Sequence, residues 1–145
     1  MQSLLYRQEL LDHAQNPRNY GAVEHPDFSA DDLNAFCGDR IAMAGRLAKD
    51  GTIAEIRFTG EGCAVSQAAA SILTERLIGR PWRTVARLTP SDMLRLLNVP
   101  LSPIRIKCGL LALTVVQKAY AGYSKAKEGS STASLRARPN FASKM

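Results

Sequence analysis

The pair Asp50-Gly51 constrains the fold of this chain most, because it separates two segments with strand-like patterns. Apolar residues alternate with other residues over 41–48, and the segment 53–58, IAEIRF, follows the pair. An Asp-Gly pair between two such segments is a strong signal for an antiparallel hairpin with a tight turn. We therefore predict strands over 41–48 and 53–58, and at least two antiparallel strands in the fold.

Helical patterns surround the predicted hairpin. Apolar residues recur at helical spacing over 3–14, 64–79 and 105–123. A capping signature over 89–92 begins a short helix that ends near Asn98. Neither an internal repeat nor a linker interrupts this order. It predicts an α+β domain in which helices cover one face of a small antiparallel sheet.

The positive charge of the chain is concentrated near its C-terminus. The formal net charge is +6, and after Tyr123 five Lys and Arg residues against one Glu account for +4 of it. Ser, Ala, Lys and Gly dominate this segment, which has no sustained apolar period. We predict a folded domain over 1–123 and a disordered basic tail over 124–145. Nucleic-acid binding is not favoured, since no aromatic interleaving accompanies the charge.

The sequence gives no indication of a membrane partner. No apolar run approaches the roughly 20 residues that span a bilayer. The N-terminal segment MQSLLYRQELLDHAQ carries charges where a signal peptide needs a continuous apolar stretch. The cysteine count of three is odd, which argues against a disulfide framework. We expect a cytoplasmic protein.

The three cysteines lie where predicted elements begin. Cys37 precedes the first predicted strand, Cys63 stands at a strand-to-helix turn, and Cys108 falls in the first turn of the last helix. Free backbone N–H groups at a helix start favour a thiolate. However, the spacing C-x25-C-x44-C matches no zinc-finger pattern. From position alone, the thiols are either small buried apolar side chains or metal ligands.

Asp39, two residues after Cys37, supports the ligand interpretation. Three thiolates and one carboxylate would complete a four-coordinate site for zinc, or for iron with sulfide. The carboxylate would be the hard and weakly held ligand, which incoming sulfide, thiol or iron displaces most readily. A permanent structural zinc would be expected to use four soft or borderline ligands instead.

Four blocks in the right order make the sequence resemble the U-type iron–sulfur cluster scaffold family, over about residues 4–123. This family includes the IscU-like scaffolds, the N-terminal part of NifU and the SufU-like branch. The blocks are LYRQELLDHAQNPRNYG, which is similar to the family's first helix and its N-P-R-N turn, and the three cysteine motifs CGDRI, TGEGCAVSQAAASILTE and RIKCGLLAL.

The resemblance implies a compact SufE/NifU-like α+β fold with a three-stranded antiparallel sheet and helices packed on one face. It also implies that Cys37, Asp39, Cys63 and Cys108 are the ligands. Gly38 would let the loop bring Cys37 and Asp39 to the same metal. These residues would hold a transient [2Fe–2S] cluster, with Zn²⁺ as the other ion expected in the same site.

The resemblance further implies partners for sulfur and cluster transfer. The site would lie exposed at one end of the domain and meet a cysteine desulfurase. Cys108 would accept the sulfur, and the cations Arg105 and Lys107 would favour its thiolate. Apo iron–sulfur acceptor proteins would then receive the cluster.

The chain combines features of two branches of the family. IscU-like scaffolds typically carry a histidine directly before the third cysteine, whereas this chain has Lys107, as in the R-x-K-C signature of the SufU-like branch. SufU-like proteins also carry an insertion between the second and third cysteines, for which the 44-residue gap leaves no room. We therefore expect a non-enzymatic scaffold that assembles [2Fe–2S] and passes it on. The alternative is a SufU-like zinc-dependent sulfurtransferase that relays persulfide sulfur, and an inert zinc-stabilised binding domain is the third candidate.

Two further partners rest on partial matches. The segment 101–105, LSPIR, resembles the Leu-Pro-Pro-Val-Lys site that Hsp70-type chaperones recognise in IscU-like proteins, but Ser102 breaks the match. Related scaffolds use an N-terminal tyrosine for self-association, so Tyr6 is a candidate contact of a homodimer.

The remaining candidates have simpler interpretations. We expect His13 and His25 at the surface or at a helix end, Trp82 packed under a loop, and the pair 31–32 in a solvated turn or at a helix start. The sequence contains no Ser-His-Asp set, P-loop or glycine-rich nucleotide loop, so nucleotide-driven catalysis has no support.

Overall fold

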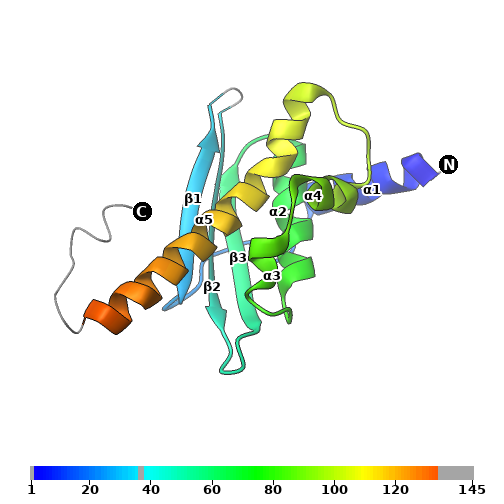
Figure 1. Cartoon of the computed structure of the whole chain (residues 1–145). Helices are drawn as coiled ribbons and strands as arrows, with labels where there is room; N and C mark the ends of the chain where they lie inside the picture. The colour runs from blue at the N-terminus through cyan, green and yellow to red at the C-terminus, as the bar shows by residue number, and fades with distance from the viewer. Residues whose placement is uncertain (1, 36–37, 134–145) are drawn as a thin grey trace.

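A computed structural model of the chain describes residues 2–35 and 38–133, with side chains placed over 7–35 and 38–126. Its elements follow one another as one helix, three strands and four helices (Figure 1). In chain order they are α1 (Gln2–Gln15), β1 (Phe28–Asn34), β2 (Asp39–Leu47), β3 (Ile53–Glu61), α2 (Ala64–Leu77), α3 (Thr84–Arg87), α4 (Pro90–Leu97) and α5 (Pro103–Ala133). The α+β prediction is confirmed. No helix in the described part of the chain is both long and apolar enough to cross a membrane.

The sheet is antiparallel with strand order β1-β2-β3, and the predicted hairpin connects β2 to β3. Gly51 takes a φ of +87°, which a residue with a Cβ rarely adopts. The Asp50 carboxylate accepts hydrogen bonds from the backbone N–H and the hydroxyl of Thr52, at 3.0 and 2.7 Å. These bonds lower the pKa of Asp50 and hold the turn closed.

The strand β1 was not predicted from the residue pattern, which placed the pair 31–32 in a solvated turn or at a helix start. Its sequence, FSADDLN, has no β-branched residue, yet it pairs with β2 from Phe28 opposite Gly45 to Asn34 opposite Asp39. As an edge strand, β1 turns alternate side chains to solvent, so the pair 31–32 lies on a strand and not in a turn. The three-stranded sheet implied by the family resemblance is nevertheless present.

The helices cover one face of the sheet. Helix α5 packs on β1 and β2, α2 packs on β3 and on α5, and α1 packs on the outer side of α2 (Figure 1). Small side chains in α2 allow these close approaches, because Ala68, Ala69 and Ala70 are completely buried. The core is built from the apolar side chains of Ile41, Met43, Ile56 and Phe58 in the sheet, Leu73 in α2, and Val115 and Val116 in α5.

Trp82 stacks on Phe28 of β1 with ring centroids 4.1 Å apart, and its ring lies 5.1 Å from that of Tyr120 in α5. The residue thus joins an aromatic cluster at the edge of the sheet and is only 7% exposed. The prediction of a loop covering Trp82 therefore missed its main partners, which come from a strand and a helix.

His13 lies in the last turn of α1, as the helix-end alternative predicted, but its side chain is buried and not at the surface. The last turn of α1 faces α2, where the His13 Nδ1 lies 2.7 Å from the Ser71 hydroxyl oxygen. The same oxygen accepts a hydrogen bond from the backbone N–H of Arg18. These bonds tie the end of α1 and the turn after it to the middle of α2.

Helix α5 is longer than predicted at both ends. It begins at Pro103, where the fixed φ of proline suits a first helical position, and it continues ten residues past Tyr123. Lys, Ala and Glu in the segment 124–128 are good helix formers, and no proline occurs between Pro103 and Pro139. The rest of the predicted tail, 134–145, lies outside the described residues, as does the side chain of Tyr6.

We predict that His13 makes the folded state sensitive to acid. Burial, followed by the charge of Arg18, lowers its pKa below 6.5 in the folded chain. The unfolded chain therefore binds a proton at a higher pH than the folded chain does, so the free energy of unfolding falls as the pH drops below about 6.5. Urea titrations at pH 8 and pH 5.5 should show a larger loss for the wild-type protein than for His13→Gln. An equal loss in both proteins would contradict a buried, neutral His13.

Candidate metal centre

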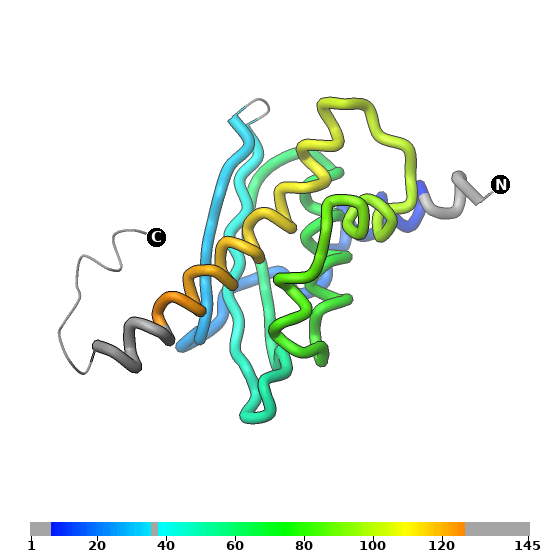
Figure 2. Tube along the Cα trace, in the orientation of Figure 1, coloured from blue at the N-terminus to red at the C-terminus, as the bar shows by residue number. Residues whose placement is uncertain are grey.

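The structure brings together three of the four predicted ligands. One donor atom each from Asp39, Cys63 and Cys108 lies within 4.8 Å of the other two. These residues come from the starts of β2, α2 and α5, which Figure 2 shows at the same end of the sheet. Cys37 lies outside the described residues, so its place in the site stays a prediction. Gly38 has a φ of +74° and links Cys37 to Asp39.

The Asp39 carboxylate fastens the start of β2 to the start of α2. It is only 2% exposed. One oxygen accepts a hydrogen bond from the backbone N–H of Cys63 at 3.2 Å, and the other accepts from the Cys63 Sγ at 3.4 Å. A buried carboxylate needs such donors, because its desolvation is otherwise very costly. Asp39 is therefore placed to approach any ion that Cys63 binds.

Gly62 makes this approach possible, which the sequence did not reveal. A Cβ on Gly62 would lie 2.6 Å from an Asp39 oxygen and 2.7 Å from the hydroxyl oxygen of Ser66, both closer than real Cβ contacts. Its φ of +156° is also unusual for a residue with a side chain. The sequence shows a glycine directly before Cys63, but only the distances to Asp39 and Ser66 show why a residue without a side chain is needed there.

Cys63 is the N-cap residue of α2, with extended backbone angles. Its side chain is half-buried and makes no capping hydrogen bond to the first turn of the helix, because its Sγ donates to the Asp39 carboxylate instead. The Ser66 hydroxyl donates to the Cys63 carbonyl oxygen at 3.1 Å and fixes this turn.

Cys108 occupies a different environment from the one predicted. Because α5 begins at Pro103, Cys108 is its sixth residue and lies in the second turn, beyond the reach of most of the dipole effect. The side chain is completely buried. Next to it, a Cβ on Gly109 would come within 2.8 Å of Leu97, so the absence of a side chain there lets α4 pack close to α5.

Arg105 supplies the positive charge at this site. Its exposed guanidinium interacts most strongly with Cys63, and more weakly with Cys108 and Asp39, which raises the pKa of Arg105. The predicted electrostatic role of Arg105 thus extends to both thiols, with Cys63 as the main partner. Lys107 is exposed on the same turn of α5.

The donor set fits a thiophilic metal. Zinc binds thiolate at about 2.3 Å and carboxylate oxygen at about 2.0–2.2 Å, which separates two donors of one tetrahedral ion by roughly 3.5–3.8 Å. Donor atoms already within 4.8 Å of one another need only small movements to reach that geometry. Two thiolates suit zinc and iron–sulfur clusters alike.

Comparison with known proteins supports this chemistry. The model of the NifU-like N terminal domain matches residues 5–130. The chain belongs to this family. The resemblance found in the four sequence blocks is therefore confirmed.

Relatives come from both branches of the family. The zinc-dependent sulfurtransferase SufU of Bacillus subtilis is 36% identical over 135 residues, covering 81% of this chain and 90% of the relative. The iron-sulfur cluster assembly scaffold protein IscU of Haemophilus influenzae is 29% identical over 129 residues, covering 87% of this chain and all of the relative.

The fold is shared with a solved structure, that of a putative iron-sulfur cluster assembly scaffold protein for the SUF system from Fervidobacterium islandicum. It superimposes with a TM-score of 0.65 at 20% identity, covering 83% of this chain and 99% of the other. The compact α+β fold that the sequence implied, described there as SufE/NifU-like, is thus confirmed as that of SufU/NifU-like scaffold domains.

We predict that Gly62→Ala lowers metal affinity about 10- to 100-fold, the usual effect of disturbing groups that orient a ligand. The added Cβ would push the Asp39 carboxylate away from Cys63. Zinc affinity can be measured by competition with a chromophoric chelator.

Gly79→Ala is the matched control. Gly79 also has a positive φ, of +87°, but a Cβ there would meet no atom within 4 Å. This variant should lose some stability and keep its zinc affinity. Equal affinity in Gly62→Ala and Gly79→Ala would refute the role assigned to Gly62.

Proposed function

We propose that this protein is an iron–sulfur cluster assembly scaffold. It receives sulfur from a cysteine desulfurase, assembles a [2Fe–2S] cluster on Cys37, Asp39, Cys63 and Cys108, and passes the cluster to apo acceptor proteins. The observation that supports this most is the convergence of Asp39 with Cys63 and Cys108 from three separate elements. A core that needed only apolar filling would not place a carboxylate between two thiols.

Sulfur enters by thiol–persulfide exchange. The Cys108 thiolate attacks the terminal sulfur of the desulfurase persulfide, a new S–S bond forms on Cys108, and the desulfurase cysteine leaves as a thiolate. The exchange consumes no oxidant. Cys108 is completely buried whereas Cys63 is half-buried, so this step requires the first turns of α5 to move outward. Arg105, which lies on those turns, carries the charge that favours the attacking thiolate.

Asp39 acts as the exchangeable ligand. Its oxygens are harder donors than thiolates, so they bind iron less firmly than Cys63 and Cys108 do. When the carboxylate leaves the iron, it can return to the backbone N–H of Cys63, which already holds one of its oxygens. This alternative partner lowers the cost of opening the site for transfer.

A second candidate function is a zinc-dependent sulfurtransferase, as the relative from Bacillus subtilis is named. The 36% identity to that relative and the Lys107 that precedes Cys108 favour it. Against it, the match extends over 135 aligned positions but covers only 81% of the 145 residues here. The relative therefore has residues in the matched region that this chain lacks, as expected if it carries the insertion of the SufU-like branch. An inert zinc domain is the weakest candidate, because it has no use for a displaceable carboxylate.

The partners follow from this function. A cysteine desulfurase and apo acceptor proteins are required, whereas an Hsp70-type chaperone at 101–105 and a homodimer through Tyr6 remain additional proposals. Ser102, which breaks the chaperone motif, has a local role: its hydroxyl accepts from the Arg105 N–H at 3.4 Å and caps α5. A site of free thiols suits a reducing compartment such as the cytoplasm.

Anaerobic reconstitution tests the scaffold function. Ferrous iron, cysteine, a desulfurase and a thiol reductant such as dithiothreitol, which reduces the persulfide sulfur to sulfide, should produce [2Fe–2S] absorption. Cys37→Ser, Cys63→Ser and Cys108→Ser should each abolish it, because serine is a poor ligand for a cluster. A protein that keeps one zinc, never acquires iron and increases desulfurase turnover would instead be a sulfurtransferase. A protein that keeps zinc and affects neither reaction would be an inert zinc domain.

Asp39→Cys tests the exchangeable ligand. A fourth thiolate should still allow assembly but should slow transfer of the cluster to an apo-ferredoxin several-fold, because thiolates hold iron more firmly. Ser29→Cys is the control, since it adds a thiol at an exposed position near the opposite end of β1, where Ser29 pairs with Ala44 and not with the start of β2. Transfer at the wild-type rate from Asp39→Cys would show that the carboxylate does not control release.

A further inference from the structure

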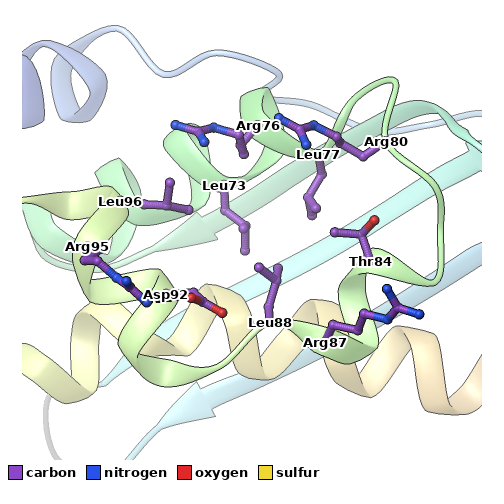
Figure 3. A pocket seen from close by; sticks show the side chains of 10 residues that line it. All are labelled: Leu73, Arg76, Leu77, Arg80, Thr84, Arg87, Leu88, Asp92, Arg95 and Leu96. Atoms are coloured by element: carbon purple, nitrogen blue, oxygen red, sulfur yellow. Dashed lines mark hydrogen bonds and ion pairs between the residues drawn. The ribbon is translucent and has the colours of Figure 1, made fainter.

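A cavity of about 400 Å³ lies beside the C-terminal half of α2, away from the metal centre. Helix α2 supplies one wall, and α3, α4 and the segment between them supply the other (Figure 3). The cavity is lined by Leu73, Arg76, Leu77, Arg80, Thr84, Arg87, Leu88, Asp92, Arg95 and Leu96.

The side chains of this cavity are segregated by polarity. The leucines point toward one another and form an apolar floor, while the arginine head groups lie around the margin (Figure 3). The four arginines are exposed, whereas Leu73 and Leu77 are buried and Leu88 and Leu96 are half-buried. An occupant would therefore place an apolar group on the floor and negative charges around it.

Most of this positive charge has no partner within the described part of the chain. Of the four arginines that line the cavity, only Arg95 forms an ion pair with a described residue, namely Asp92 at 2.8 Å. The Asp92 carboxylate also accepts from the Thr89 N–H to close the capping box of α4, which lowers its pKa. Arg76, Arg80 and Arg87 form no ion pair with any described residue. The cavity thus presents a net positive charge.

The nature of the negative charge follows from the available donors. Phosphate sites in proteins commonly use backbone N–H groups at a helix start. Here the capping box already occupies the start of α4, and α3 has only four residues. Recognition must come from arginine side chains, which bind carboxylates and phosphates alike through paired hydrogen bonds, so the apolar floor has to distinguish the occupant. An apolar anchor within an arginine margin is also typical of protein interfaces.

We propose that this cavity docks an acidic segment of a partner protein, which inserts a leucine-like side chain among the leucines and places carboxylates on Arg76, Arg80 and Arg87. A neighbouring cavity shares Arg76 and Arg80 but also contains Glu9 and Glu75. These acids limit the positive area on that side. Leu73 lies ten positions after Cys63, which corresponds to about 15 Å along the helix, so the partner can bind while the metal centre is in use.

The experiment uses fluorescent twelve-residue peptides and the full-length protein. The first peptide carries two leucines flanked by glutamates, the second has serine in place of leucine, and the third has glutamine in place of glutamate. Fluorescence anisotropy should show saturable binding of the first peptide alone, weakening several-fold between 50 and 300 mM salt. The triple variant R76E/R80E/R87E should lower its affinity at least tenfold.

Arg83→Glu is the matched control, because Arg83 is an exposed arginine beside α3 that does not line the cavity. This variant should bind the first peptide like the wild type, and all variants should keep their zinc affinity and melting temperature. Leu88→Ser should lower the affinity for the first peptide without changing the salt dependence of that affinity.

Three results would overturn the proposal. One is the absence of saturable binding of the leucine peptide below about 1 mM. The second is equal binding of the serine peptide, which would show a charge effect without an apolar anchor. The third is displacement of the leucine peptide by an equal concentration of ATP, which would identify the cavity as a site for small anions.

Discussion

The buried Asp39 carboxylate is the interaction on which the functional end of this molecule depends. It joins the first residue of β2 to the N-cap of α2 through the N–H and Sγ of Cys63. Burial of a carboxylate is unfavourable unless donors surround it. The fold meets this requirement with a glycine, since only the missing Cβ of Gly62 allows the two elements to approach so closely. The same arrangement that satisfies Asp39 places a hard ligand beside a soft one.

How far the sequence predicts the fold depends on whether the signal is local. The hairpin was predicted because Asp50-Gly51 determines its turn without help from the rest of the chain. The edge strand β1 was missed, since its identity comes from pairing with β2 and from its cover by α5. The burial of His13 was missed for the same reason: its partner Ser71 lies 58 positions away. Long-range contacts leave little trace in a single residue pattern.

The candidate site shows the same division. Spacing alone left the three thiols open between burial and metal binding, and the family resemblance selected the ligands. The structure then brought Asp39, Cys63 and Cys108 together, but it also changed the electrostatic argument. Cys63 is the thiol at the helix N-terminus, and it is also the main partner of Arg105. The last helix was predicted to begin at residue 105, but α5 begins at Pro103. Cys108 therefore lies in the second turn, where it does not have the dipole effect that the prediction assigned to it.

Opening of the site can remain local because α5 is held unequally along its length. Its middle is fixed by Val115 and Val116, which are completely buried against the sheet and α2. Its first turns follow an irregular segment and are capped by the Ser102 hydroxyl at 3.4 Å, which is a long hydrogen bond. Small local energies govern such helix ends, whereas displacing the whole helix would expose the core. We therefore expect an outward movement of the first turns to expose Cys108 while the sheet and α2 stay in place.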